Sequence, residues 1–312
     1  MKGLNQVLFK GNKRKQRAFR KMLMILPFMI LIWMFSYLPL FGWRYAFYDF
    51  KPPRPLSKCE FVGFKWFISL FENDIKRKQI IQVLMNTFAM SGLDIATSWL
   101  PMMFAIFLNE IRGKRFKKCV QTCTTIPNFI SWVLVYSLAF ALFSSTGMVN
   151  SLLMKLGIID TPILFLQSAK HTWLTMWAWS TWKNLGWSAI MYMAAIAGID
   201  QEQYEAARVD GAKRFQLIRY ITIPNLLPTF FVLLIMSVSN FLNNGMEQYF
   251  VFENAFNSDR IQVLDLYVYN LGMKGGNYSL ATAVSIMKSV VSVTLLLVVN
   301  GMSKVFRGES LM

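Results

Sequence analysis

Three ionisable side chains, Asp94, Lys183 and Lys288, lie inside long apolar stretches of this chain. A charge within hydrocarbon is costly, so such residues usually face a cavity, a partner or one another. One chemistry open to them is electrostatic binding, in which Lys183 or Lys288 meets an anionic substrate. The alternatives are structural: Asp94 neutralises one of the lysines, or a long lysine stem carries its ammonium group to the membrane interface.

Polar and aromatic side chains accompany these charges. Amide and hydroxyl groups beside aromatic rings can bind a sugar, by hydrogen bonds and by stacking. The structural alternative is that the tryptophans anchor helices at the lipid interface and that the polar groups join helix to helix. The candidates for a substrate path are Lys183, Asn184, Trp187, Asn240, Asn243, Ser285 and Lys288.

The sequence offers no set of residues for catalysis. It lacks paired carboxylates, a Ser/His/Asp arrangement and metal-ligand spacing, and its only histidine is His171. The fragment Gly113-Lys114-Arg115 has neither the upstream glycine nor the following hydroxyl of a phosphate-binding loop. We therefore predict no catalytic residue, no metal site and no bound cofactor, and we expect ATP and Mg²⁺ to bind to separate chains. A membrane-embedded enzyme is disfavoured.

The three cysteines are read as structural thiols: Cys59, Cys119 and Cys123.

The elements that must position these residues are membrane helices. The chain is 55% hydrophobic and only 16% charged, which is typical of a membrane protein. A crossing needs roughly 20 apolar residues. We predict an all-α, polytopic transmembrane bundle of six helices, covering residues 22–43, 83–108, 126–143, 172–197, 226–242 and 280–302.

A short polar stretch, residues 200–224, separates the fourth and fifth of these segments. Asp200, followed by Gln203, predicts a helix start in which the carboxylate caps the helix and the amide reaches back. Gly211 can take positive φ and end that helix. A second short helix is expected over 212–221, with Pro224 resetting the chain into the next apolar run. The product is a helix, turn, helix element on the membrane surface.

The first of these helices carries Glu205-Ala206-Ala207, where small side chains allow a partner to approach the backbone and the carboxylate offers two acceptor atoms to an arginine. With Gly211 three residues later and Ile221-Thr222-Ile223-Pro224 nine residues beyond that, this spacing resembles the signature loop of the membrane subunits of binding-protein-dependent ABC importers. It departs from the usual pattern only in Ile223, where leucine is commoner.

The resemblance implies the type I importer permease fold (MetI-like). It also implies that this loop is the coupling helix that docks on a cytoplasmic ATPase. The ATPase-coupling residues that it carries over are Glu205, Ala206, Ala207, Asp210, Gly211 and Ala212.

Two further stretches, residues 61–67 and 278–285, resemble carbohydrate-uptake permeases related to the maltose permease. Residues 50–52 and 287–291 are similar to the LplB branch of that family. The resemblance implies import of oligosaccharides, including uronate-containing polysaccharide fragments, for which intramembrane lysines would make electrostatic sense. It implies as partners a second homologous permease, two ATP-binding cassette subunits, an extracytoplasmic solute-binding protein and the oligosaccharide.

Charge predicts the orientation. Residues 1–21 hold Lys or Arg at eight positions and no acidic residue, which favours a cytoplasmic N-terminus in a bacterial cell membrane. We expect a permease domain over 22–302 and a cytoplasmic tail over 303–312. The net charge of +17 fits membrane lipid rather than nucleic acid, because the basic residues gather beside the crossings. The alternatives are an importer of a different small solute, or a secondary transporter driven by an ion gradient, which would need no ATPase.

Overall fold

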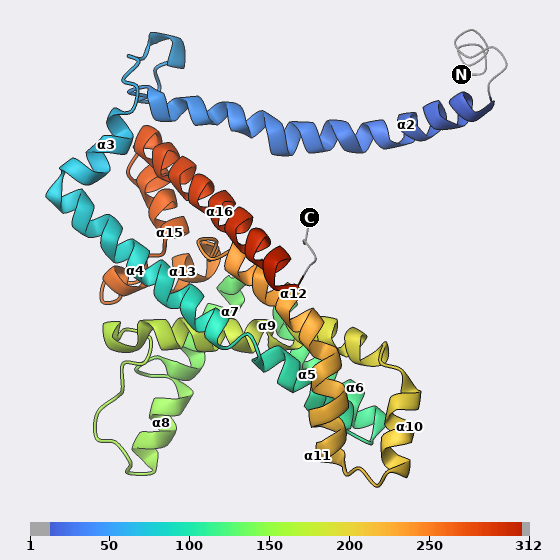
Figure 1. The fold of residues 1–312 in the computed structure, drawn as a ribbon. Coiled ribbons are helices and arrows are strands. Elements are labelled where there is room, and N and C mark those ends of the chain that lie inside the picture. Colours follow the sequence, from blue (N-terminus) through green and yellow to red (C-terminus); the bar gives the residue numbers. More distant parts are fainter. Residues whose placement is uncertain (1–12, 308–312) are drawn as a thin grey trace.

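The computed structural model describes residues 13–307, and the regular secondary structure of this part of the chain is helical apart from an isolated β-bridge between Tyr48 and Phe61. The predicted all-α fold is confirmed (Figure 1). The basic residues before Lys13 and the end of the predicted tail lie outside the described residues. The helices are α2 (Lys13–Ile32), α3 (Lys65–Glu72), α4 (Asp74–Ala96), α5 (Leu100–Glu110), α6 (Lys114–Thr125), α7 (Trp132–Phe143), α8 (Met148–Lys155), α9 (Thr172–Ala197), α10 (Gln201–Val209), α11 (Arg214–Leu217), α12 (Ile223–Ser239), α13 (Glu247–Phe252), α14 (Ser258–Ile261), α15 (Leu264–Tyr269) and α16 (Tyr278–Arg307).

Five helical stretches in the described chain are long and apolar enough to cross a membrane, by length and composition. They are Arg17–Phe47, Asp74–Glu110, Trp132–Lys155, Arg214–Ser239 and Tyr278–Gly301. The predicted fourth crossing, α9, is more polar along its length. Its 26 residues nevertheless make a helix of roughly 39 Å, longer than the ~30 Å hydrocarbon layer. Six predicted crossings and these helices therefore agree approximately.

Prolines break two of the predicted crossings. The second was expected as one helix, but α4 ends at Ala96 and α5 begins at Leu100, with Pro101 in its first turn. The third contains Pro127 in a 3₁₀ turn, which leaves α7 only 12 residues long. Proline lacks the N–H that would continue a helix and its ring crowds the preceding turn, so each break has a local cause.

The long helix α9 is the centre of the bundle and packs against α4, α5, α6 and α12. Its closest approach is to α6, where an ideal Cβ placed on Gly186 would come within 2.2 Å of the Thr124 carbonyl oxygen. Only glycine fits at this crossing. Below it, Ala105, Ala189 and Leu226 are fully buried and join α5, α9 and α12 into one core.

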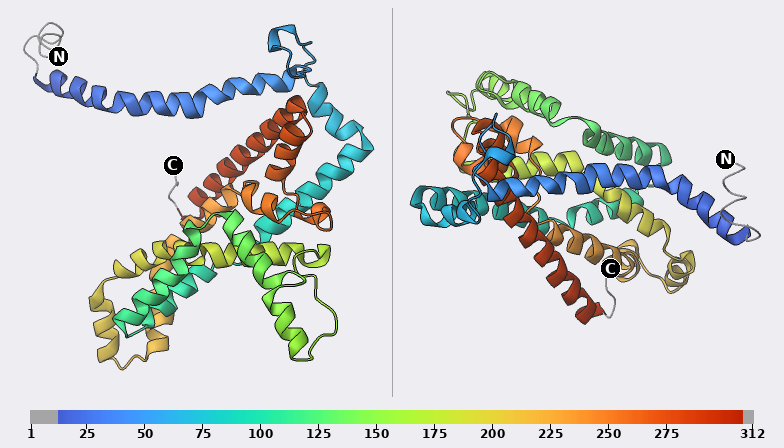
Figure 2. Two further views of the ribbon diagram at one scale, coloured as in Figure 1. Left: turned by 180° about the vertical axis from the view of Figure 1, so that it is seen from behind. Right: turned by 90° about the horizontal axis from the view of Figure 1, so that it is seen from above.

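The first helix is the exception to this packing. In Figure 1 and in the left view of Figure 2, α2 projects away from the other helices, joined to them only at its far end. The most apolar part of the stretch Arg17–Phe47 buries none of its residues within this chain. At the other terminus, α16 continues through Arg307, so the predicted tail begins inside a helix.

Candidate docking surface and substrate groove

The polar stretch after α9 begins with the predicted helix cap. The Asp200 carboxylate accepts a hydrogen bond from the backbone N–H of Glu202 at 3.0 Å, and α10 starts at the next residue after the cap. The expected return contact from Gln203 is absent among the described contacts. Its Oε1 instead accepts a hydrogen bond at 3.1 Å from the amide of Asn225, on α12. A tertiary partner has therefore replaced the local one.

Gly211 ends α10 as predicted. Its φ is +81°, a left-handed value that side chains disfavour, and nothing lies within 4 Å of where a Cβ would stand. The turn is closed by backbone hydrogen bonds, including one of 2.9 Å from Ala212 N–H to the Ala207 carbonyl. The glycine is therefore required by the backbone conformation and not by crowding.

The second helix differs from the prediction. Four residues of α11 pass through a π-helical turn, Ile218–Thr222, directly into α12. Pro224 lies in the first turn of α12 and does not interrupt the chain. A π turn provides a wider helix just before the proline, which relieves the clash that proline makes with the preceding carbonyl. Arg214–Ser239 is consequently one helical stretch of 26 residues.

Side-chain contacts fasten α10 to this stretch. The Tyr204 and Thr222 hydroxyls are hydrogen-bonded at 2.9 Å. Arg214 Nε lies 3.8 Å from a carboxylate oxygen of Glu110, at the end of α5. In Figure 1, α10 and α11 lie together at one end of the bundle. The element that the sequence places at the surface therefore makes side-chain contacts with α5 and with the helical stretch that contains α12.

The opposite side of this element is exposed, and we call it the docking surface. Glu205, Ala206, Asp210 and Gly211 are exposed, while Ala207 and Ala212 are half-buried. Val209 is 88% exposed, which is unusual for an aliphatic side chain unless another surface covers it. All six predicted coupling residues thus belong to one outward-facing turn of helix and loop.

A polar groove of about 540 Å³ lies farther along the same helices, where the break between α4 and α5 faces α9 and α12. Three of the predicted path residues line it: Asn184, Trp187 and Asn240. The others do not. The complete lining is Asp94, Thr97, Ser98, Leu100, Pro101, Ser180, Thr181, Asn184, Leu185, Trp187, Ser188, Met191, Tyr192, Leu233, Leu234, Met236, Ser237 and Asn240.

Lys183 is directed away from this groove and is only 6% exposed. Its Nζ donates hydrogen bonds to the carbonyl oxygens of Pro127 at 3.1 Å and Asn128 at 2.7 Å, and lies 5.4 Å from the centre of the Trp132 ring. The ammonium group thus gives both carbonyls of the turn before α7 a side-chain donor, in addition to the backbone N–H of Ile130 that the Pro127 carbonyl accepts at 3.2 Å. The suggested pairing of Lys183 with Asp94 is wrong.

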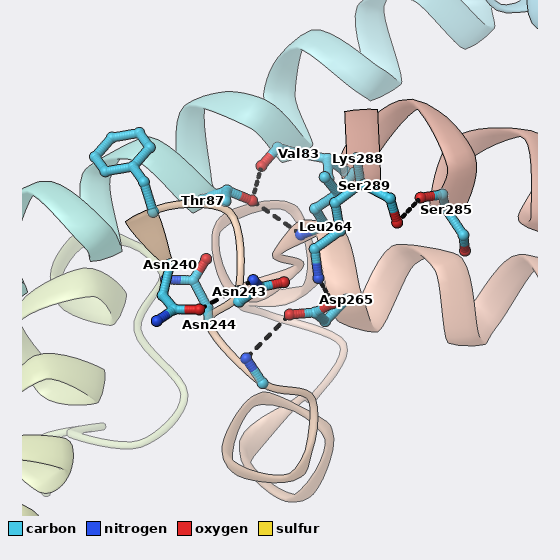
Figure 3. A network of polar contacts seen from close by, with 12 residues as sticks. Val83, Thr87, Asn240, Asn243, Asn244, Leu264, Asp265, Ser285, Lys288 and Ser289 are labelled. Carbon is cyan, nitrogen blue, oxygen red and sulfur yellow. Dashed lines mark hydrogen bonds and ion pairs between the residues drawn. The ribbon is translucent and has the colours of Figure 1, made fainter. Parts of the chain in front are cut away.

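Lys288 forms an ion pair with Asp265, and so is not paired with Asp94 either (Figure 3). The second oxygen of the Asp265 carboxylate accepts a hydrogen bond of 3.0 Å from Gly245 N–H. The pair therefore joins α16, α15 and the loop that follows α12. Ser285, one turn before Lys288, donates its hydroxyl hydrogen bond within α16, to the Ala281 carbonyl at 2.9 Å.

Asn243 lies beside the groove rather than in its lining. Its amide donates a long hydrogen bond of 3.4 Å to Asn240 Oδ1 (Figure 3). The neighbouring Asn244 donates one of 2.9 Å to Ser91 on α4. These amides connect the end of α12 to α4. Of Asn240, Asn243 and Asn244, Asn240 is the one that lines the groove.

Sequence reasoning missed the hydroxyl groups of the groove. On α9, Ser180 and Ser188 each lie four residues from the predicted Asn184, and this helical spacing is a signal that the sequence contained. Thr97 and Ser98 could not be recognised in the same way, because they become accessible only through the break after α4.

The molecule now has the features of a transport component: a polytopic helical bundle, an exposed loop at one end and a polar groove between its long helices. Residues 100–307 match the family described as the inner membrane component of binding-protein-dependent transport systems, and the chain belongs to this family. It is a multi-pass membrane permease subunit of an ABC importer and not an enzyme.

Its relatives include the protein LplB of Bacillus subtilis, 38% identical over 93% of this chain and 90% of the relative. The polygalacturonan/rhamnogalacturonan transport permease YteP of the same organism is 35% identical over 99% of this chain and 97% of its own. A crystal structure of a bacterial ABC transporter that imports the acidic polysaccharide alginate superposes with a TM-score of 0.82 at 33% identity, covering 94% of this chain and 97% of that one. This agreement confirms the predicted type I permease fold.

Proposed function

We propose that this chain is the membrane subunit of an ATP-driven oligosaccharide importer, in which residues 200–224 couple to the ATPase and the groove belongs to the sugar path. One observation carries the proposal: the helical stretch Arg214–Ser239 begins beside the docking surface and ends beside the groove. Movement of the docking surface, passed to this stretch through the turn at Gly211 and the Tyr204–Thr222 hydrogen bond, would reach Ser237 and Asn240 along one run of helix.

The partners follow from the same arrangement. The docking surface combines small side chains, the Glu205 carboxylate and the exposed Val209, which suits a cleft on a separate ATPase. We propose a complex of this chain, a second homologous permease, two ATPase subunits that bind ATP and Mg²⁺, and an extracytoplasmic solute-binding protein. A structure of the related alginate transporter was determined together with a periplasmic protein holding an alginate pentasaccharide, which supports the last of these.

An oligosaccharide substrate is supported by two independent features. Relatives that align over most of this chain are named for polygalacturonan, rhamnogalacturonan or galactooligosaccharide transport. The groove itself presents hydroxyl and amide groups together with Trp187, a combination that binds sugars through hydrogen bonds and ring stacking. We propose substrates derived from polysaccharides, with neutral and uronate-containing fragments as the two classes to be compared.

The proposed setting is a bacterial cell membrane with both termini in the cytoplasm. The basic residues 1–21 favour the cytoplasm for the N-terminus. A cytoplasmic ATPase that docks on residues 201–212 requires that loop to lie in the cytoplasm too.

The decisive experiment is ATP hydrolysis by the complete complex in lipid vesicles. The binding protein is loaded either with an oligogalacturonate or with the same oligosaccharide after reduction of its carboxyl groups. We expect loaded binding protein to stimulate hydrolysis and to drive sugar uptake into the vesicles. Complexes whose ATPase cannot hydrolyse ATP are the control and should show no uptake.

Stimulation by the uronate form supports an acidic substrate, while stimulation by the reduced form alone keeps the importer and discards that specificity. Stimulation by neither sugar removes the oligosaccharide proposal. Uptake that persists without ATP hydrolysis removes the coupling proposal.

A further inference from the structure

Asp94 is the only acidic or basic side chain among the described residues that line the groove. It stands in the last turn of α4, immediately before the break that leads to α5. In an apolar segment an ionisable residue is expected to have a charge partner or to serve a functional site. The question is which of these applies to Asp94.

No charge partner is found for Asp94 among the side chains that the structure describes. None of them forms an ion pair or a hydrogen bond with its carboxylate, and its backbone carbonyl receives a long hydrogen bond, of 3.5 Å, from Thr97. The two lysines of the neighbouring helices are committed to the carbonyls of residues 127 and 128 and to Asp265. The carboxylate is therefore left to water or to whatever occupies the groove.

The surroundings of Asp94 define the chemistry of that occupant. Ser98, Ser188 and Asn184 add neutral hydrogen-bonding groups, and Trp187, which is 48% exposed, adds an aromatic ring to the lining. The two oxygens of a carboxylate can accept hydrogen bonds from two neighbouring hydroxyls of a pyranose ring, and charge-assisted bonds of this kind are the strong ones. A sugar carboxylate at the same place would face a like charge.

We infer that Asp94 is a specificity-determining residue of the sugar path: its carboxylate accepts hydrogen bonds from adjacent hydroxyls of a sugar unit in the groove, and it repels a uronate carboxylate from that position. An acidic oligosaccharide then passes through the groove with its carboxylates turned away from Asp94 and α4. The inference deepens the proposed function and rests on it.

The test uses the complete complex in vesicles with wild-type chain, Asp94→Asn, Asp94→Ala and, as a matched control, Asp160→Asn. Asp160 is an exposed carboxylate in the loop after α8, outside the groove. Each complex receives binding protein loaded with an oligogalacturonate or with its carboxyl-reduced form, and every rate is divided by the wild-type rate for the same sugar. The preference of the binding protein cancels in this ratio.

We expect Asp94→Ala to lower uptake of the reduced, neutral sugar by at least about 10-fold, the usual worth of a hydrogen bond to a charged group. Asp94→Asn should raise the ratio of uronate uptake to neutral uptake by a similar factor, because the repulsion is gone. Asp160→Asn should leave both rates unchanged. The isosteric Asn variant removes no internal contact, and its assembly is checked by gel filtration.

The inference is overturned if Asp94→Asn and Asp94→Ala match wild type with both sugars, or if they lower both by the same factor. Failure of the proposed function is distinct from either result, because wild-type complex would then respond to neither sugar.

Discussion

Individual charges in the apolar part of this chain are mostly held by its own polar groups. Lys183 closes a proline-broken turn and Lys288 joins two helices to a loop, whereas Asp94 alone of the three faces the groove. The residue types were the same in the sequence. What separates a structural charge from a binding charge is the presence of a partner within reach, and that depends on the tertiary arrangement.

A double-mutant cycle tests the structural assignment of Lys288. We expect Lys288→Met to destabilise the chain by about 2 kcal/mol, because it leaves the Asp265 carboxylate partly buried without its cation. The double variant Lys288→Met, Asp265→Asn should recover part of that loss, since the charge is removed as well. Thermal unfolding in detergent measures both.

The same variants address substrate contact. The ratio of uronate to neutral uptake should be the same in Lys288→Met as in wild type. A change in that ratio would return Lys288 to the sugar path and contradict the structural assignment.

Residue-level prediction from the sequence worked where the cause was local. The Asp200 cap and the positive φ of Gly211 depend on a few neighbouring residues, and both are confirmed. The partner of Gln203 lies 22 residues away, and that of Lys183 more than 50 residues away, so neither could be found from spacing along the chain.

At the scale of elements, the decisive feature is that α11, the second helix of the docking loop, continues into α12. The loop was expected to be two short helices separated from the next crossing by Pro224. The π-helical turn Ile218–Thr222 removes that separation. A loop joined to α12 by a hinge could absorb movement, whereas the proposed coupling uses a helix that continues from α11 into α12.

Substitutions in the loop should therefore uncouple the subunits without unfolding the bundle. Gly211→Pro cannot adopt φ of +81°, and Glu205→Ala removes an exposed carboxylate that makes no described ion pair. We expect each to lower sugar-stimulated ATP hydrolysis and uptake several-fold, with normal amounts of protein in the membrane.

Two matched controls keep this prediction sharp. Gly157→Pro changes another positive-φ glycine, in the loop after α8, and Glu72→Ala removes another exposed carboxylate, at the end of α3. Both should retain coupling. Wild-type coupling in Gly211→Pro and Glu205→Ala would remove the docking assignment.

The extent of the elements was predictable where sequence and membrane demand the same thing. The fourth crossing was placed at residues 172–197, and α9 has these bounds. The breaks at Pro101 and Pro127 were not anticipated, because apolar length alone does not distinguish a continuous helix from two segments joined in line. The first of these breaks exposes Thr97 and Ser98 to the groove. The sequence therefore predicted part of the lining from α9 and α12, but not the part that comes from this break.

At the scale of the whole molecule, the helices differ in how much of their apolar surface is buried within this chain. Alongside a bundle whose cores are well buried, α2 presents large apolar side chains such as Phe28, which is 66% exposed, with no packing on the rest of the chain. Exposed apolar side chains of this size are expected to be covered, by lipid or by the proposed second permease.

Comparing two substitutions tests this division. Leu226→Ala, at a fully buried position between α5, α9 and α12, should cost about 2 to 5 kcal/mol. Phe28→Ala should leave the unfolding temperature of the isolated chain in detergent nearly unchanged, and lower the stability of the assembled complex if the second permease covers it. An equal loss in both isolated variants would mean that α2 packs on its own chain.

The stretch Arg214–Ser239 has a thermodynamic consequence as well as a mechanical one. If sugar in the groove changes the affinity of the docking surface for the ATPase by some factor, then ATPase binding must change the affinity of the groove for sugar by the same factor. The two changes in affinity thus report one coupling free energy, and measuring either of them in this complex gives the other.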